Sequence, residues 1–320
     1  MTRNSRKTTA PGPGATTPPA ATGTTAATTV PSDEALARSL PGGFTSEYAT
    51  VNGLRMHYVT GGHGDPLFLL PGWPQTWWAF HKIMPDLARH HRVVAVDIRG
   101  QGGTDMPEGG YDKKTMASDL LGLVHTLGYR QVNLTGHDIG AMVAYSFAAN
   151  YPEATRKLAL LDTPPADASD YDRPLLMRPN RGVALWWWAF NQLHELPEQL
   201  LAGRMRHLLD WLFAHSLADQ DLVTEQDREI YAHAHNTPEA IRSGTAWYQA
   251  FHQDIEDLAK YPPLTMPLLG IAGTYTYDEL QRKLPPLGTD VRVQQASGSV
   301  HFLPEEEPEL ISEALLEFFA

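Results

Sequence analysis

One short stretch, residues 134–145, constrains the fold of this chain more than any other. An apolar run ends in Gly136-His137-Asp138-Ile139-Gly140, and an alanine-rich segment that favours a helix follows at once. This order predicts a strand, a tight turn and a helix, in which the turn strains its central residue and holds the Asp138 side chain out at the top of a sheet. A carboxylate there can attack carbon by displacement. Asp and Gly also form ordinary turns, so the rest of the chain must decide between these interpretations.

The composition limits the classes of partner. The chain has 320 residues, of which 42% are hydrophobic, enough for one large α/β domain with an inserted subdomain. The net charge of -12 argues against nucleic acid and anionic membranes as partners. No apolar run approaches the roughly 20 residues that span a bilayer, and the absence of cysteine excludes disulfides and thiol catalysis. We expect a cytoplasmic protein without a membrane or nucleic-acid partner.

Hydrophobic patterning divides the chain into three parts. Residues 1–43 are rich in Thr, Ala, Pro and Gly at their start and are predicted to be a disordered tail and lead-in. Residues 44–162 and 264–320 alternate strands and helices, which predicts a mostly parallel sheet covered on both faces. Residues 163–263 lack strand-like runs and are predicted to form a helical cap. The expected strands are 46–51, 54–60, 66–70, 92–96, 131–135, 157–162, 267–273 and 291–294, and the expected helices are 77–90, 115–127, 185–193, 197–215, 225–235, 238–253 and 308–319.

Three motifs together resemble those of the α/β-hydrolase fold. They are the turn around Asp138, the loop at residues 71–77 and the segment Gly298-Ser299-Val300-His301-Phe302-Leu303-Pro304-Glu305. The resemblance covers residues 44–320 and is to the branch with an aspartate nucleophile, which contains epoxide hydrolases and haloalkane and haloacetate dehalogenases. It implies an eight-stranded, mostly parallel sheet flanked by helices, a helical cap, and no cofactor or metal. The chain departs from the family pattern at Pro71, where relatives carry a histidine.

The resemblance assigns roles to the reacting groups. Asp138 would be the nucleophile and His301 the base, with Asp162 or Asp278 as the acid that orients the base. Asp162 is favoured, because it closes an apolar strand, whereas Asp278 is explained as an N-cap of a helix. The backbone N–H groups of Trp73 and Ile139 would form the oxyanion hole.

The leaving group separates the chemistries of this branch. Ile139 and Met142 stand where haloacetate dehalogenases carry other residues, which disfavours haloacetate. Epoxide opening needs hydrogen-bond donors over the epoxide oxygen, and the resemblance nominates Tyr248 and Trp187. Tyrosine and indole groups both donate, but only the phenol titrates.

The cap segment around Trp187 also resembles that of epoxide hydrolases from angucycline pathways. The resemblance implies a bulky aromatic, polyketide-like substrate and a role in antibiotic biosynthesis, with stacking on aromatic side chains. The predicted substrate-binding residues are Trp186, Trp188, Trp77, Trp247 and Phe302.

The sequence therefore predicts an epoxide hydrolase that forms a vicinal diol through an ester on Asp138. A haloalkane dehalogenase and a non-catalytic scaffold that binds a hydrophobic ligand are the alternatives. The predicted partner is a small hydrophobic epoxide, and a homodimer is left open.

Overall fold

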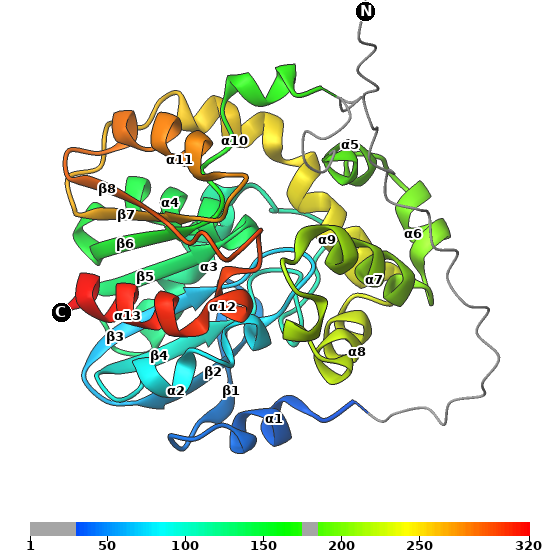
Figure 1. The fold of residues 1–320 in the computed structure, drawn as a ribbon, viewed down its shortest axis with the longest axis horizontal. Helices are drawn as coiled ribbons and strands as arrows, with labels where there is room; N and C mark the ends of the chain where they lie inside the picture. The colour runs from blue at the N-terminus through cyan, green and yellow to red at the C-terminus, as the bar shows by residue number, and fades with distance from the viewer. Residues whose placement is uncertain (1–29, 175–184) are drawn as a thin grey trace, which may run out of the picture.

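The computed structural model describes residues 30–174 and 185–320, so the tail predicted for residues 1–29 lies outside the described part. Its centre is an eight-stranded sheet in the order β1-β2-β4-β3-β5-β6-β7-β8 (Figure 1). β1 and β2 pair antiparallel, as do β2 and β4, and the remaining neighbours are parallel. The predicted mostly parallel sheet is confirmed. The strands are β1 (Thr45–Val51), β2 (Leu54–Gly62), β3 (Asp65–Leu70), β4 (His91–Val96), β5 (Val132–His137), β6 (Thr155–Leu161), β7 (Leu268–Ala272) and β8 (Val291–Gln295).

The first two strands form the hairpin that Asn52-Gly53 predicts. Val51 pairs with Leu54, and the two residues between them have φ angles of 51° and 77°. Positive φ at both central positions is the requirement of the two-residue turn that matches strand twist, and Asn and Gly adopt it most readily.

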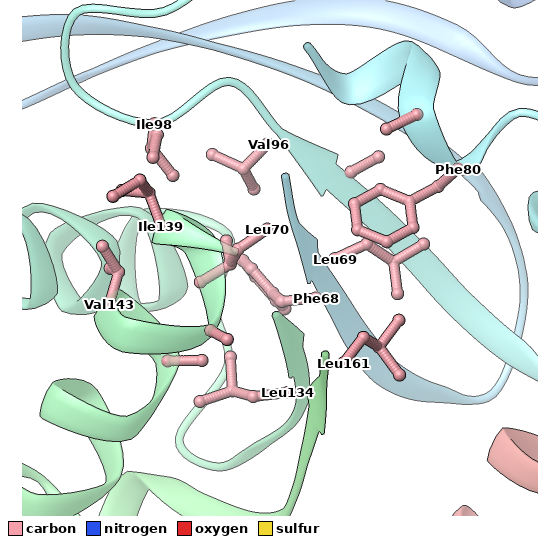
Figure 2. Close-up of a cluster of buried hydrophobic side chains, with 14 of the residues drawn as sticks. Phe68, Leu69, Leu70, Phe80, Val96, Ile98, Leu134, Ile139, Val143 and Leu161 are labelled. Carbon is pink, nitrogen blue, oxygen red and sulfur yellow. The ribbon is translucent and has the colours of Figure 1, made fainter. Parts of the chain in front are cut away.

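Helices cover both faces of the sheet. In Figure 1, α2 (Met84–Leu87) and α13 (Pro308–Phe319) lie on one face, and α3 (Lys113–Thr126) and α4 (Ile139–Asn150) lie on the other. Because both faces are covered, the central strands are apolar at consecutive positions. Figure 2 shows the cluster that results around Phe68, Leu134 and Leu161, all fully buried. Full burial of each such side chain contributes about 1.5–3 kcal/mol to folding.

A helical insertion separates β6 from β7. Its helices are α5 (Trp186–Asn191), α6 (Leu196–Leu201), α7 (Met205–Ser216), α8 (Glu225–Ala234), α9 (Pro238–Gln249) and α10 (Phe251–Leu258). Those from α5 to α9 gather beside one end of the sheet (Figure 1). In the described ranges, no helix is both long and apolar enough to cross a membrane.

Three predicted helices are interrupted. Residues 77–90 form a 3-10 turn at Trp77–Phe80 and then α2, because Pro85 lacks the N–H that a continuous helix needs and sits in the first turn of α2 instead. Residues 197–215 divide into α6 and α7 next to Gly203, whose φ of 73° lies outside the helical range. Residues 238–253 divide at Ala250 into α9 and α10.

The predicted lead-in to the domain contains a helix, α1 (Asp33–Ser39), where the sequence indicated an unstructured approach. Ser32 caps it by accepting a hydrogen bond from the Ala35 N–H at 3.3 Å, and Leu36 and Ala37 are buried. Asp33 accepts a bond of 2.7 Å from the indole N–H of Trp77. Residues 33–39 therefore belong to the folded domain.

Candidate active site

The turn between β5 and α4 holds Asp138 in a backbone conformation that few side chains adopt. Its φ and ψ are 51° and -123°. The strand and helix approach so closely that a Cβ atom on Gly136 would lie 2.3 Å from the carbonyl oxygen of Gly140, and one on Gly140 would lie 2.1 Å from that of Leu70. The two glycines thus permit the strained turn, and the strain marks Asp138 as a functional candidate.

The Asp138 carboxylate is fixed at one oxygen. The N–H of Trp73 donates to its Oδ1 at 2.8 Å, while Oδ2 lies 3.9 Å from Nε2 of His301. Ile139 is the first residue of α4, so its N–H is among those that a helix leaves without an internal partner. One oxygen is thereby held by an amide, and the other faces the histidine.

Asp162, at the end of β6, orients His301. Its Oδ2 lies 2.5 Å from Nδ1 of His301, and its Oδ1 accepts from the N–H of Gly273 at 2.9 Å and from the hydroxyl of Thr276. Asp278 instead lies in the first turn of α11 (Tyr277–Lys283), and the N-cap position belongs to Thr276, so the interpretation of Asp278 as an N-cap is wrong. The structure pairs the histidine with Asp162.

Charge raises the pKa of His301. Burial alone would lower it, but the hydrogen bond to Asp162 and the negative charges of Asp162, Asp138 and Glu306 outweigh burial and raise the pKa to about 9. The imidazole is therefore protonated at neutral pH. The raised pKa of His301 thus depends in part on the neighbouring Asp138.

His137, which precedes Asp138, has no predicted role but contacts the His301 loop. Its Nε2 lies 2.8 Å from the carbonyl oxygen of His301, and the two rings lie 4.9 Å apart. Burial, and next the charge of His301, lower the pKa of His137 to about 4. The ring is neutral, and its Nε2–H donates to the carbonyl.

A cavity of about 350 Å³ opens over these groups. Most of its wall is apolar or aromatic, and the charged groups are the catalytic candidates and a cluster around Arg173. The lining residues include Trp73, Asp138, Asp162, Pro164, Arg173, Leu185, Trp187, Trp188, Leu212, Ser216, Glu279, His301 and Phe302. Apolar walls with few polar groups are typical of small-molecule sites.

Tyr248 lies behind this wall. Only 1% of it is exposed, it is absent from the described lining, and its ring packs edge-on against Trp73 with centroids 5.8 Å apart. Burial and the negative charge of Asp138 raise the pKa of Tyr248 above its ordinary value, so the phenol stays protonated.

Two buried polar groups near this wall lack partners. Neither the Tyr248 hydroxyl nor the carboxamide of Asn191 has a hydrogen-bond partner of good geometry among residues 30–174 and 185–320, although Asn191 and Trp187 lie near enough to the hydroxyl to lower the pKa of Tyr248 in part. A buried unpartnered group costs about 1–3 kcal/mol, which is uncommon unless a ligand or water uses it. Asn191 lies one helical turn after Trp187, so both side chains lie on the same side of α5. Asn191 is a candidate that the sequence did not reveal.

The predicted substrate-binding side chains divide into two groups. Trp188 and Phe302 line the cavity, whereas Trp77, Trp247 and Trp186 are not among the described lining residues. The indole of Trp77 donates to Asp33, and that of Trp247 donates to the carbonyl of Arg99 at 2.9 Å. Trp186 packs instead on Trp211, with centroids 5.5 Å apart. The structure thus places Trp77 and Trp247 in the core and Trp186 against Trp211, all three outside the described lining of this cavity.

The cluster around Arg173 was not predicted either. Its Nε donates to Asp170 at 2.7 Å, a second guanidinium nitrogen contacts Glu279, and Lys283 reaches Asp170 at 3.1 Å. The guanidinium also lies 4.9 Å from the centre of the Trp188 ring. These contacts tie the segment after β6 to α11 and support one aromatic wall of the cavity.

Comparison with known proteins places this geometry among hydrolases. The model of the alpha/beta hydrolase fold matches residues 65–211. A soluble epoxide hydrolase from Corynebacterium sp. (strain C12) is 34% identical over 286 residues, covering 86% of this chain and 97% of that protein. A fluoroacetate dehalogenase from Burkholderia sp is 28% identical, covering 87% of this chain and 94% of its own. The solved structure of epoxide hydrolase CorEH without ligand has a TM-score of 0.75 at 31% identity, covering 87% of this chain and 99% of that chain.

Proposed function

The chain belongs to the α/β-hydrolase fold family, and we propose that it is an epoxide hydrolase that opens an aromatic epoxide to a vicinal diol through an ester on Asp138. The observation that carries this proposal is the asymmetry of the Asp138 carboxylate. Oδ1 accepts a hydrogen bond from the N–H of Trp73, whereas Oδ2 faces His301 and Asp138 lines the cavity. The similarity to soluble epoxide hydrolases supports the choice of substrate.

In the first step, Oδ2 of Asp138 attacks one carbon of the epoxide, and the bond from that carbon to the epoxide oxygen breaks. The oxygen develops negative charge, needs donors, and takes up one proton, which balances the proton that His301 releases when the charge of Asp138 is lost. Trp187 lines the cavity, and its indole N–H is one donor. Tyr248, whose phenol is protonated and makes no hydrogen bond of good geometry among the described residues, is the second donor.

In the second step, His301 removes a proton from water, and the water oxygen attacks the ester carbonyl carbon. Formation of the ester removes the charge of Asp138, which is one cause of the high pKa of His301, so that pKa falls as the base is needed. The carbonyl oxygen is the former Oδ1, already bonded to the Trp73 N–H, and the Ile139 N–H is the second donor. Collapse expels the second diol oxygen, which takes the proton from His301, and the carboxylic acid left on Asp138 gives its proton to the imidazole, which restores the starting carboxylate and imidazolium.

The aromatic wall supports a flat, bulky substrate. Trp187, Trp188 and Phe302 offer ring faces and edges in a cavity of about 350 Å³, which suits an aromatic polyketide-like epoxide. This substrate class would place the enzyme in antibiotic biosynthesis.

The test is a single turnover of excess enzyme on an aryl epoxide in heavy-oxygen water, with mass analysis of the diol and of the peptide that holds Asp138. We expect unlabelled diol and label on Asp138, because water attacks the ester carbonyl. Label in the first diol with none on Asp138 would instead establish direct attack by water. Halide release from a bromoalkane, without diol formation from epoxides, would establish the dehalogenase alternative.

A further inference from the structure

Glu306, the last residue of α12 (Leu303–Glu306), binds the loop that carries His301. Its side chain is largely buried, with 7% exposed. Oε2 accepts from the N–H groups of Val300, His301 and Phe302 at 3.1, 2.9 and 2.7 Å, and from the Ser299 hydroxyl at 2.7 Å. Three consecutive amides thus surround one carboxylate oxygen.

This arrangement fixes the backbone of His301 from both sides. Its N–H donates to Glu306, and its carbonyl oxygen accepts from His137. Successive N–H groups that converge on one anion form a stable concave site, and hydrogen bonds to a charged acceptor contribute about 1.5–3 kcal/mol each. The position of the imidazole therefore depends on the Glu306 side chain, although that side chain does not touch the reacting atoms.

The second oxygen of Glu306 reaches the helical insertion. Oε1 accepts from the N–H of Ala218 at 2.8 Å and from that of Val300 at 3.1 Å. Ala218 follows α7 closely, and Leu212 and Ser216 of α7 line the cavity. One carboxylate thus joins the His301 loop to the helix that forms a wall of the substrate cavity.

The neighbouring residues strengthen this junction. Glu305 accepts a short hydrogen bond from the Tyr231 hydroxyl of α8. The ammonium group of Lys82 donates to the carbonyl oxygens of Glu305 and Leu222, at 2.9 and 2.5 Å. Two consecutive glutamates of α12 therefore face the insertion, but only Glu306 also binds the His301 loop.

We propose that Glu306 is a positioning residue that aligns His301 for ester hydrolysis and makes this alignment depend on the docking of α7. The proposal rests on the two-step route through Asp138. In that route the attack on the epoxide uses Asp138 and the oxygen donors, and His301 is needed as a base only in the second step. A displaced His301 loop should therefore slow ester hydrolysis and leave ester formation intact.

Two substitutions separate the two connections. Glu306→Ala removes both. Glu306→Gln can keep an oxygen at the Oε2 position, where four donors meet, and then presents its amide N–H groups to the Ala218 N–H. Glu307→Gln is the matched control, because it removes a negative charge from the adjacent residue. In the described loop, the Glu307 side chain accepts only from the Gly298 N–H, at 3.0 Å.

The experiment is rapid-quench single turnover of an aryl epoxide, in which mass analysis of the Asp138 peptide gives the rates of ester formation and decay. We expect ester decay to slow about 10- to 100-fold in Glu306→Ala, as a displacement on the order of 1 Å does at other sites. Glu306→Gln should slow it less, and Glu307→Gln should match the wild type. Ester formation should stay within about twofold in all three. If Glu306→Ala does not fold, Ser299→Ala removes one loop bond and should slow ester decay alone.

Three results would overturn the proposal. Equal losses in ester formation and decay would indicate a general structural role, and wild-type decay in the Glu306 variants would show that the loop holds its position without the carboxylate. Absence of ester on Asp138 even in His301→Gln would disprove the two-step route itself, and the proposal would fall with it. His301→Gln therefore distinguishes failure of the proposed function from failure of the role of Glu306.

Discussion

The two sides of the cavity are built differently. On the sheet side, amides, a hydroxyl and mutual contacts hold Asp138, Asp162 and His301, with Oδ2 of Asp162 only 2.5 Å from Nδ1 of His301. On the insertion side, Tyr248 and Asn191 are buried without a hydrogen-bond partner in the described ranges. The sheet side is organised before substrate arrives, whereas the insertion side keeps donors unused. We infer that the sheet side serves bond making and the insertion side serves the substrate oxygen.

The largest effect should follow from loss of the nucleophile. Asp138→Ala removes the carboxylate that we propose forms the ester, so turnover of an aryl epoxide should fall on the order of 10⁵-fold or more, as for nucleophiles elsewhere. Steady-state kinetics with circular dichroism as a check on folding would measure this. Residual turnover above about a hundredth of wild type would assign the nucleophile to another residue.

Loss of the base His301 should separate ester formation from ester hydrolysis. In His301→Gln, steady-state turnover should fall about 10²- to 10⁴-fold, because the water that attacks the ester loses its base. Ester formation should persist, so the Asp138 peptide should accumulate the mass of the substrate. A variant that turns over freely with no trapped ester would contradict the role of His301.

Loss of a donor should give the opposite pattern on the insertion side. Tyr248→Phe should slow ester formation about 10- to 100-fold, within the range for loss of a single donor to developing charge or somewhat below it. The melting temperature should change little, because the hydroxyl that is removed makes no hydrogen bond of good geometry among the described residues.

Tyr231→Phe is the matched control for Tyr248→Phe. The Tyr231 hydroxyl bonds the buried Glu305 carboxyl, so its loss should destabilise the fold by about 1–3 kcal/mol without a selective loss of ester formation. If Tyr248→Phe destabilised the fold and left ester formation unchanged, the Tyr248 hydroxyl would be structural, and the contrast between the two sides would fail.

The pH dependence of the second step should report the charge of Asp138. The pKa of His301 is about 9 in the free enzyme, and esterification removes one charge that raises it. The rate of ester decay should therefore rise with pH, with a midpoint below the His301 pKa that NMR titration gives for the free enzyme. Equal midpoints would mean that the ester leaves the electrostatics of the base unchanged.

The sequence predicted the positions of the groups on the sheet side better than those on the insertion side. Glycine spacing encodes the turn at Asp138, and a short continuous segment carries His301, so local sequence was sufficient for both. Asp162 could be placed because it ends a strand beside the turn. These are backbone features, and the chain specifies them within a few residues.

Side-chain direction was not readable in the same way. The indole of Trp247 donates to the carbonyl of Arg99, 148 positions away, and the Glu306 carboxylate accepts from the N–H of Ala218, 88 positions away. Such contacts exist only once the insertion is packed on the sheet. The short helix α1 was not predicted, because its seven residues adjoin a tail of biased composition.

The smallest effect should distinguish a core tryptophan from a cavity tryptophan. Trp77 is fully buried, and its indole N–H donates to Asp33 at 2.7 Å. Trp77→Phe should reduce stability by roughly 0.5–1.5 kcal/mol for the lost bond, with a further loss from packing, and leave kcat and KM unchanged. Trp188→Phe, which alters the cavity wall, should instead raise KM for a bulky aryl epoxide while stability changes little. Chemical denaturation and steady-state kinetics on both variants measure this. A higher KM in Trp77→Phe would mean that a change in the packing around Trp77 and α1 alters substrate binding in the cavity. Trp77 would then count among the residues that shape the substrate wall.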